Sequence, residues 1–398
     1  MLGGAMGYAQ TELGVVSPCP YVEVRGAAED RGLQYGCAVS DRIALGVAHY
    51  REQLAANGFC QADIDNAASQ LLPAIQAFDP QYLQEMQGIA KGSKQSLSSI
   101  VLLNARTELL QLARRRAAGR PGVDGEPDGC TGVIVMPAAT RHGRLLHAQN
   151  WDWKADCAET AVVLGVIGHN GAPSLLTFTE AGGLARSGLN SAGICITANY
   201  LECERDYSQP GVPLALIRRK VLEQRHLAAA LHAVYCTAKS ASNNMMVSHA
   251  QGLAFDFECA PDETFQLLPQ GGLLVHANHW VSEVALGKLR DMGLVSTPDS
   301  LYRDQRVRVL LEPLCGRIEA RHVKGALFDR FGGEWAVCRP PRLGRSNNLS
   351  ASVAMIVMEP ALGIMEVAML PALNREFQTF RLPMEFQPEP VDYLLKEP

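Results

Sequence analysis

Hydrophobic residues recur at three- and four-residue spacing in the first part of the chain, and this pattern predicts amphipathic helices. Asp79, followed by a proline, and Ser96 or Ser98 are residue types that begin helices. Beyond position 130 the pattern changes to short runs rich in Val, Ile, Leu and Thr between Gly- or Asn-containing turns, which predict strands. The helices predicted for the first part span 41–55, 62–77, 80–91 and 97–111.

The predicted strands fall in blocks that are separated by helices. The first block is typical of an antiparallel meander, with hairpin turns at 142–143, 169–171 and 190–193. Because helices stand between blocks of strands instead of alternating with single strands, the pattern predicts an α+β fold built in layers. The predicted strands span 131–136, 145–149, 160–167, 174–180, 193–200, 244–249, 253–259, 264–268, 273–277, 352–358 and 364–369, and the later helices 212–224, 226–239, 302–314 and 319–328.

Residues 114–129 have the sequence RRRAAGRPGVDGEPDG, which is rich in charge, glycine and proline and has no apolar period. Such a composition predicts an exposed linker. Cys130 follows it directly, at the start of the first predicted strand.

Composition excludes several classes of function. With 36 Lys and Arg against 41 Asp and Glu, the 398-residue chain has a formal charge of −5, and no basic surplus favours nucleic acid or an anionic membrane surface. The most apolar stretch, 350–370, is interrupted by charged residues and by proline, so no membrane span is expected. Residues 1–10 lack the positive and apolar regions of a secretory signal, which predicts a cytoplasmic protein.

The eleven cysteines are an odd number and include no C-x-x-C spacing, so neither a disulfide framework nor a zinc ribbon is expected. Cys130 differs from the others in its position between a flexible segment and a strand. One interpretation is a buried strand cysteine. The second is a chain that cuts itself between Gly129 and Cys130.

Self-cleavage would make Cys130 both nucleophile and base. Gly129 has no side chain, so its backbone can adopt strained angles that bring the thiol to the preceding carbonyl. An acyl shift from nitrogen to sulfur, followed by hydrolysis, would leave Cys130 with a free α-amino group. That amine has a reference pKa of about 7.7–8.0, against about 8.5 for a thiol, and can accept the thiol proton near neutral pH.

Several ordered motifs give the chain a family resemblance. The chain resembles the isopenicillin N acyltransferase (acyl-coenzyme A:6-aminopenicillanate acyltransferase) family of N-terminal nucleophile hydrolases, over roughly residues 26–370. The motifs are Asp128-Gly129-Cys130-Thr131, Gln149-Asn150-Trp151-Asp152, Thr179-Glu180-Ala181-Gly182, Gly188 to Gly193, Gly211-Val212-Pro213 and Asn278-His279. Earlier matches are Gly26, Gly32, Gly36, Glu85-Met86-x-Gly88 and Asn104-x-Arg106-Thr107-Glu108.

The resemblance implies a four-layer αββα sandwich and a proenzyme, or zymogen, cut before Cys130. Residues 1–129 would form a helical prosegment, or α chain, ending in the linker, and residues 130–398 the catalytic β chain, both in one folded body. The implied chemistry is acyl transfer at amide bonds through a thioester on Cys130. Asp152 matches the catalytic aspartate of the family, and Asn278 matches its oxyanion-hole asparagine.

Further residues in the matched motifs are expected to support the site or line a substrate pocket: Asn150, Trp151, Glu180, Asn190 and Arg345. Asn190 to Gly193 also has the composition of a hairpin turn, because Asn and Gly tolerate positive φ. The chain departs from the family at a late Ser-Arg pair, where Asn348 and Leu349 align, with Arg345 a few residues earlier.

The function predicted from these features is hydrolysis of a small N-acyl amide by a thiol enzyme that needs neither cofactor nor metal. The expected partners are the small-molecule amide and the chain's own cleaved α chain. The sequence leaves open whether the protein forms a homo-oligomer. A second hypothesis is transfer of the acyl group to an amine, from an amide or a coenzyme A thioester.

The sequence leaves three more hypotheses open. His276 and Asn278 lie 146 and 148 residues after Cys130, within the range of about 130–150 typical of papain-like enzymes, although no papain signature surrounds Cys130. His276-x-x-His279 and the pair His142 and His147 leave open a metal hydrolase, although neither has a helical His-Glu-x-x-His setting. The third hypothesis is a binding protein that has kept the fold but catalyses no reaction.

Overall fold

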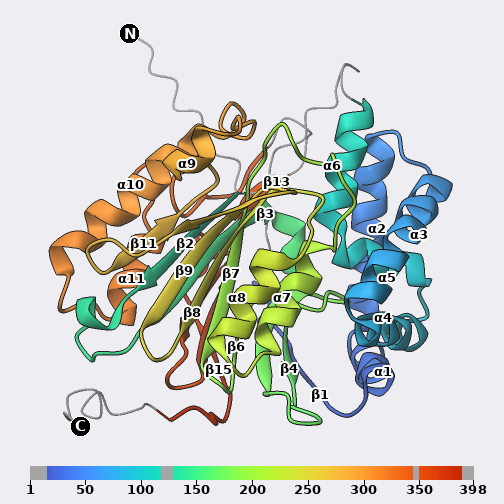
Figure 1. Ribbon diagram of the computed structural model, residues 1–398, viewed down its shortest axis with the longest axis horizontal. Helices are drawn as coiled ribbons and strands as arrows, with labels where there is room; N and C mark the ends of the chain where they lie inside the picture. The colour runs from blue at the N-terminus through green and yellow to red at the C-terminus, as the bar shows by residue number, and fades with distance from the viewer. Residues whose placement is uncertain (1–15, 118–128, 344–348, 388–398) are drawn as a thin grey trace.

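The computed structural model describes residues 16–117, 129–343 and 349–387 (Figure 1). Its N-terminal region is a helical bundle at one side of the molecule, drawn from blue to teal. The predicted helix starts are confirmed, since Asp79 Oδ1 accepts from Gln81 N and Ser96 Oγ from Ser99 N. This region comprises β1 (Tyr21–Val24), α1 (Ala28–Ala38), α2 (Ser40–Ala56), α3 (Gln61–Phe78), α4 (Pro80–Ser93), α5 (Leu97–Asn104) and α6 (Arg106–Ala117).

Two predictions for this region were wrong in their boundaries. The helix expected over 97–111 is broken at Ala105, which has φ −121° and ψ 25° and so separates α5 from α6. Helix α6 then continues to Ala117, so the first residues of the predicted linker are helical. The rest of that linker, 118–128, lies outside the described residues.

Helices α1 and α4 cross backbone to backbone, and glycine makes this possible. A Cβ at Gly32 would lie 2.1 Å from Glu85 O, and one at Gly88 would lie 2.2 Å from Glu29 O. Any larger residue would therefore push the helices apart. Two of the glycines in the N-terminal motifs, Gly32 and Gly88, owe their identity to this contact.

The β-structure forms two sheets. The first, which we call sheet A, has the strand order β1-β4-β5-β6-β7-β8-β9-β10, with β1 parallel to β4 and the other neighbours antiparallel. Its later strands are β4 (Ala161–Val166), β5 (Leu175–Glu180), β6 (Ser187–Asn190), β7 (Ile194–Tyr200), β8 (Asn243–His249), β9 (Leu253–Cys259) and β10 (Thr264–Leu267).

The second, sheet B, has the order β11-β2-β3-β13-β14-β15, with β12 paired to β13. The predicted meander is therefore divided, because β2 and β3 pair in sheet B while β4 to β7 belong to sheet A. Sheet B consists of β2 (Gly129–Val135), β3 (Leu146–Lys154), β11 (Leu273–His276), β12 (Arg342–Leu343), β13 (Leu349–Glu359), β14 (Ile364–Met369) and β15 (Gln378–Arg381).

The two sheets pack face to face, with β2 and β3 against β7, and a helical pair covers the outer face of each (Figure 1). Helices α7 and α8 lie on sheet A, and α10 and α11 on sheet B. This is the four-layer αββα order that the resemblance implied. The helices of this part are α7 (Leu214–Leu222), α8 (Leu227–Cys236), α9 (Glu283–Leu286), α10 (Asp299–Leu311) and α11 (Ala320–Leu327).

The N-terminal bundle is joined to the sandwich by more than apolar packing. Strand β1 forms an edge of sheet A, and Glu85 Oε2 of α4 accepts from Arg31 Nε at 2.6 Å and from Arg219 Nη2 of α7 at 3.2 Å. All three side chains are buried. Removing one partner of such a buried pair typically costs about 3–5 kcal/mol, so this cluster fixes the bundle against α7.

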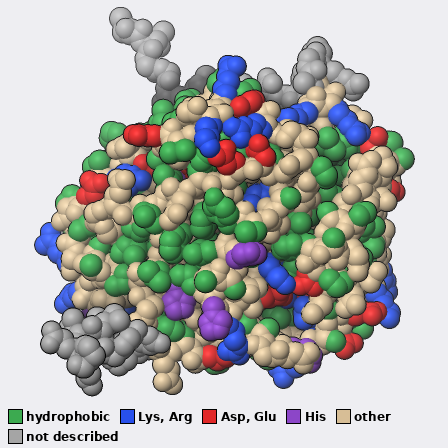
Figure 2. All heavy atoms as spheres, in the orientation of Figure 1, with side chains coloured by type: hydrophobic (Ala, Val, Ile, Leu, Met, Phe, Trp, Pro, Cys, Tyr) green, Lys and Arg blue, Asp and Glu red, His purple; other side chains and the backbone are tan. Residues whose placement is uncertain are grey.

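No helix in the described ranges is long and apolar enough to cross a membrane. Figure 2 shows hydrophobic side chains over the middle of the face in view, while along its upper edge acidic and basic side chains are intermixed.

Candidate active site

Cys130 lies at the second position of β2, paired with Trp151 of β3, while Gly129 is paired with Asp152. Both β2 residues are fully buried or nearly so. Side chains alternate between the two faces of a strand. The Cys130 thiol therefore points into the space between the sheets, and Asp152 points to the outer face of sheet B, toward α10.

The backbone of Cys130 is held on both sides by polar groups from distant segments. Its N–H donates to Asn278 Oδ1 at 2.8 Å, and its carbonyl accepts from Arg303 Nη1 at 2.5 Å. Arg303 Nη2 also donates to Asn278 Oδ1, at 2.8 Å. Burial lowers the pKa of Arg303, and neighbouring Arg339 lowers it further. Arg303 thus ties the backbone of Cys130 to α10.

Asn278 lies beside Cys130, as predicted, but its amide is turned with the oxygen toward Cys130. Oδ1 accepts from Cys130 N, while Nδ2 donates to Tyr200 O at 3.0 Å. In the uncut chain Asn278 therefore acts as an acceptor for the nitrogen that self-cleavage would release, and one of its two side-chain N–H groups donates to Tyr200 O.

Asp152 is held within a set of opposite charges. Its Oδ1 accepts from Ser352 Oγ at 2.5 Å, next to a bulge in β13, and its Oδ2 lies 3.4 Å from Arg339 Nε. Asp299 also contacts Arg339 and accepts from Arg303 Nε at 2.8 Å. Burial alone would raise the pKa of Asp299, but Arg303 and Arg339 hold it below its ordinary value. The outer face is thus a network of alternating charges around Gly129.

Arg186 is the charged neighbour of the thiol on the inner face. Its Nη2 lies 3.4 Å from Cys130 Sγ, and its guanidinium lies 4.2 Å from the centre of the Trp151 ring. Trp151 in turn packs edge-on against Phe178. A positive charge at this position stabilises a thiolate, and the stacked indole fixes the guanidinium in place.

The remaining predicted residues divide by what they contact. Trp151 is part of the thiol's surroundings. Asn150 points to the helix side and donates to Leu327 O and Val337 O, which anchors α11 and the following loop. Arg345 lies outside the described residues.

Glu180 and Asn190 serve neighbouring elements. Glu180 accepts from Arg106 Nε at 2.7 Å and from Tyr50 Oη at 2.5 Å, so it joins sheet A to the N-terminal helices. Asn190 Nδ2 donates to Leu222 O and Gln224 O at the end of α7. The hairpin interpretation of Asn190 is confirmed by its place in the β6–β7 turn, where its carbonyl accepts from Gly193 N.

Sequence reasoning missed four charged residues and one hydroxyl in this site: Arg186, Arg303, Arg339, Asp299 and Ser352. Arg303 and Asp299 stand four residues apart on α10, a spacing at which helical side chains meet. Arg186 lies between two matched motifs, after Gly182 and before Gly188. Arg339 lies beside Asp152, whereas Arg345, which the sequence singled out as a supporting residue, lies outside the described residues.

His276 lies on β11, and its ring is committed to two acceptors. Nε2 donates to Glu258 Oε1 at 2.8 Å and Nδ1 to Ala277 O at 3.0 Å. Burial would lower its pKa, but Asp256 and Glu258 raise it to about 9. A protonated imidazole with both N–H groups engaged cannot accept a thiol proton, so the geometry opposes the papain-like hypothesis.

His279 Nδ1 lies 2.7 Å from Ser300 Oγ, and within the described ranges no group of three or more His, Cys, Asp or Glu side chains could hold a metal ion.

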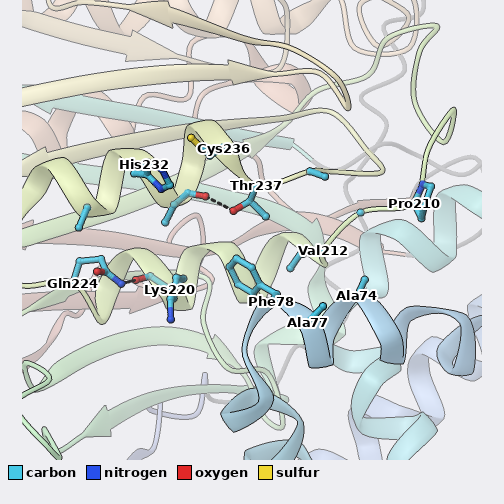
Figure 3. A pocket seen from close by; sticks show the side chains of 14 residues that line it. Ala74, Ala77, Phe78, Pro210, Val212, Lys220, Gln224, His232, Cys236 and Thr237 are labelled. Atoms are coloured by element: carbon cyan, nitrogen blue, oxygen red, sulfur yellow. Dashed lines mark hydrogen bonds between the residues drawn. The ribbon is translucent and has the colours of Figure 1, made fainter.

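An apolar groove of about 620 Å³ lies elsewhere, between α3, α7 and α8 (Figure 3). Phe78 of α3, Lys220 of α7 and His232 of α8 are among the side chains around it. Since α7 and α8 cover the outer face of sheet A, this groove is separated from the thiol by that layer.

The family model described as acyl-coenzyme A:6-aminopenicillanic acid acyl-transferase matches residues 139–365, which is more than half of the chain. The chain belongs to this acyltransferase family. The matched region contains Asp152, Asn278, Arg303 and Arg339, and it begins nine residues after Cys130.

A curated member of the acyltransferase family is similar along most of its length. The acyl-coenzyme A:6-aminopenicillanic-acid-acyltransferase 40 kDa form of Emericella nidulans is 29% identical over 334 residues, which cover 82% of this chain and 86% of the relative.

Solved structures show more distant likeness. A mutant of the conjugated bile acid hydrolase from Clostridium perfringens is 13% identical with a TM-score of 0.46, over 64% of this chain and 92% of that one. Penicillin V acylase from Agrobacterium tumefaciens is 14% identical with a TM-score of 0.46, over 64% and 86%.

Proposed function

We propose that this acyltransferase family member is a self-cleaving cysteine amidohydrolase, cut between Gly129 and Cys130, that hydrolyses a small N-acyl amide through a thioester. Membership of the family makes the chain an enzyme of acyl hydrolysis or transfer at C–N bonds. One observation carries the finer proposal. The peptide unit that joins Gly129 to Cys130 lies between Asp152, which is paired with Gly129, and Asn278, whose Oδ1 accepts from Cys130 N, while Arg303 donates to the following carbonyl, that of Cys130.

In the first step Cys130 Sγ attacks the carbonyl carbon of Gly129. The C–N bond breaks, the nitrogen takes the proton that the thiol gives up, and the Gly129 acyl group becomes a thioester on sulfur. Water then hydrolyses the thioester, releasing the Gly129 carboxylate and restoring the thiol. Asn278 Oδ1 already accepts from this nitrogen, so it can hold the new α-amine in place.

Asp152 supports the amine from the outer face. A Cβ placed on Gly129 would lie 3.1 Å from Asp152 Oδ2, so the carboxylate packs against Gly129. A fixed negative charge here stabilises the α-ammonium that forms when the amine takes the thiol proton. Residues Asp152 and Asn278 thus position the base, and Arg186 lies beside the nucleophile.

In turnover the same groups act on an external amide. The α-amine takes the thiol proton, Sγ attacks the substrate carbonyl, and the α-ammonium gives its proton to the leaving amine. Water ends the cycle by hydrolysing the acyl-enzyme thioester. Charged hydrogen-bond donors aimed at a developing oxyanion accelerate such steps by roughly 10²–10³-fold.

The test is turnover of a panel of N-acyl amides by wild type, Cys130→Ala and Cys195→Ala. Cys195 is a matched control, because it is a buried strand cysteine whose sulfur lies 3.5 Å from Met358 Sδ. We expect Cys130→Ala alone to lose both turnover and self-cleavage. Turnover by an uncut Cys130→Ala chain would overturn the proposal.

Transfer to an amine remains the second candidate, favoured by the acyltransferase name of the Emericella nidulans relative. The same panel, run with amine acceptors and with acyl-coenzyme A donors, separates the two. A new amide product in excess of free acid assigns transfer.

A further inference from the structure

A polar cavity of about 230 Å³, which we call the junction cavity, lies where the N-terminal bundle meets the sandwich. Helix α1 and the start of α4 form one side of it, and α7 and the turn between β4 and β5 form the other. Helices α1 and α4 lie at the lower right of Figure 1, beside the end of sheet A formed by β1 and β4. The cavity shares no lining residue with the charged and polar groups described around Cys130.

Arg31 of α1 lines the junction cavity, and only one nitrogen of its guanidinium group is engaged. Nε donates to Glu85 Oε2 at 2.6 Å. Among the described residues, Nη1 and Nη2 have no hydrogen-bond acceptor, although Arg31 is only 7% exposed. Leaving the donors of a buried charge unmet is costly, so these two nitrogens favour an acceptor inside the cavity.

The carboxylates that line the cavity are already occupied by other donors. Asp79 accepts from a backbone N–H through Oδ1 and from Lys220 Nζ through Oδ2. Glu223 accepts from Arg219 Nε through Oε1 and from Tyr82 Oη through Oε2. Each of these four oxygens therefore has a donor, and the groups left to bind a ligand are mainly N–H groups.

Hydrogen bonding, and not a surplus of charge, indicates the kind of ligand. The formal charges around the cavity balance, since Arg31, Arg219 and Lys220 are matched by Asp79, Glu85 and Glu223. The two outer nitrogens of a guanidinium lie side by side in one plane, and the oxygens of a carboxylate or phosphate fit them with two parallel hydrogen bonds. An oxyanion therefore satisfies both unmet nitrogens of Arg31 at once.

The size of the cavity indicates that the ligand is larger than a simple ion. A water molecule needs roughly 10–15 Å³, so the cavity of about 230 Å³ has room for roughly 15–23 water-sized atoms. Inorganic phosphate alone would leave most of this space to water. Gln81, His169 and Asn170 also line the cavity, so the rest of the ligand is polar and not an acyl chain.

We propose that the junction cavity binds a small organic oxyanion, a phosphate monoester or a polycarboxylate, whose oxygens accept from Nη1 and Nη2 of Arg31. Arg31 and Asp79 belong to residues 1–129, whereas Arg219 and Lys220 belong to residues 130–398. The bound ligand therefore contacts both parts of the chain and stabilises their association, because it binds only the folded body. The inference applies to an uncut chain as well as to a cut one.

The test is thermal unfolding of the wild-type protein over a series of concentrations of glucose 6-phosphate, of citrate and of neutral glucose, with KCl holding the ionic strength constant. The first two arms separate a phosphate ligand from a carboxylate ligand. We expect one of these oxyanions to raise the midpoint in a saturable way, by about 3 °C at a hundredfold excess over Kd, and glucose to have no such effect. Excluded anions also stabilise proteins, but without saturation. No saturable rise with either oxyanion would overturn the inference.

Two variants locate the binding. Arg31→Lys keeps a charge that can pair with Glu85 but lacks the two outer nitrogens, so the saturable rise should disappear. Ala172→Leu, on the β4–β5 turn, fills part of the cavity and leaves every ion pair in place, so Kd should rise at least tenfold. Arg25→Lys is the matched control, because Arg25 is exposed and pairs with Glu23 outside the cavity. A wild-type Kd in both cavity variants, or in Ala172→Leu if Arg31→Lys does not fold, would overturn the inference.

The same titration of Cys130→Ala separates this inference from the proposed function. Because the junction cavity does not include the thiol, this variant should bind the oxyanion with the wild-type Kd. Loss of binding in Cys130→Ala would assign the ligand to the thiol site and overturn the inference. A wild-type chain that binds the oxyanion but cleaves no amide would instead overturn the proposed function alone.

Discussion

The two faces of sheet B at the start of β2 differ in how their charges are paired. On the outer face, Arg303 and Arg339 both contact Asp299, and Arg339 also lies against Asp152. On the inner face, Arg186 and Arg218 hydrogen-bond to a thiol and an amide. Paired charges hold a fixed geometry, whereas a surplus of one sign favours binding of the opposite sign.

The comparison assigns different tasks to the two faces. We propose that the outer face positions the bond between Gly129 and Cys130, and that the inner face, which carries the thiol, receives the substrate. Changes on the outer face should therefore affect self-cleavage most, and changes on the inner face should affect the choice of substrate.

The largest effect is expected from Asp152→Asn. The amide keeps the shape of the side chain but removes the negative charge that favours protonation of the Cys130 nitrogen as the C–N bond breaks, so self-cleavage should slow by roughly 10²–10⁴-fold. The half-time of cutting after a pulse of cell-free synthesis measures it. Ser352→Ala, which removes only the hydrogen bond to Asp152, should slow cutting far less. If Asp152→Asn were cut at the wild-type rate, the outer face would have no part in positioning.

The second-largest effect is expected from Arg303→Met. It removes the buried Arg303 donor to the carbonyl of Cys130 and one of the two cationic partners of Asp299, so we expect a stability loss of about 3–5 kcal/mol together with slower cutting. Urea unfolding measures the stability. Arg308→Met is the control, because Arg308 lies on the same helix and pairs with Asp304 but is partly exposed. Equal losses in the two variants would mean that Arg303 has no special place in the network.

A smaller effect is expected from Gly129→Ala. The added Cβ would lie 2.8 Å from Arg339 Nη1 and 3.0 Å from Asp152 Cβ, so the network must shift to admit it. Cutting should slow by about tenfold, which corresponds to roughly 1.4 kcal/mol in the barrier. The half-time of cutting after a pulse of cell-free synthesis measures this rate. Once the chain is cut, residue 129 belongs to the released end, and turnover per cut molecule should be unchanged. A fall in that turnover would contradict the assignment.

The smallest effect is expected from His276→Gln, and it concerns pH. Because the pKa of His276 is raised to about 9 in the folded chain, its stabilising effect is complete below the unfolded pKa of about 6.5 and is lost as pH rises through about 9. The free energy of unfolding of wild type should fall over this window, and the variant should lack that part of the slope. Abolished turnover with unchanged stability would instead support the papain-like hypothesis.

Much of the fold was predictable because its elements have strong local signals. Strands β9 and β14 begin and end at the predicted residues, since their apolar runs are bounded by turns. The turns at 142–143 and 169–171 contain Gly143, Asn170 and Gly171 with positive φ, as those residue types favour.

The assignment of strands to sheets was not predictable from local pattern. Strands β3 and β4 follow each other closely in the sequence, yet lie in different sheets because β3 pairs with β13, about 200 residues later. Strands β1, β6, β12 and β15 were missed; β12 has two residues and the other three have four residues each.

The residues of the site also divide into those that a local motif indicates and those that depend on distant contacts. Cys130, Asp152 and Asn278 were proposed from motifs, and the fold brings Cys130 and Asn278 into contact. Arg303 and Arg339 were not found, because their partners lie 173 and 187 residues earlier and an arginine alone carries no signal of burial. The orientation of Asn278 also could not be predicted, since it depends on Arg303 and Tyr200.

The most direct test of the account is the mass of the purified wild-type protein beside that of Cys130→Ala. The account predicts two wild-type fragments, residues 1–129 and 130–398, the second with Cys130 as its N-terminal residue, and one uncut chain of 43.1 kDa for the variant. A wild-type chain that remains at 43.1 kDa while it hydrolyses amides, or a cut at another bond, would contradict it.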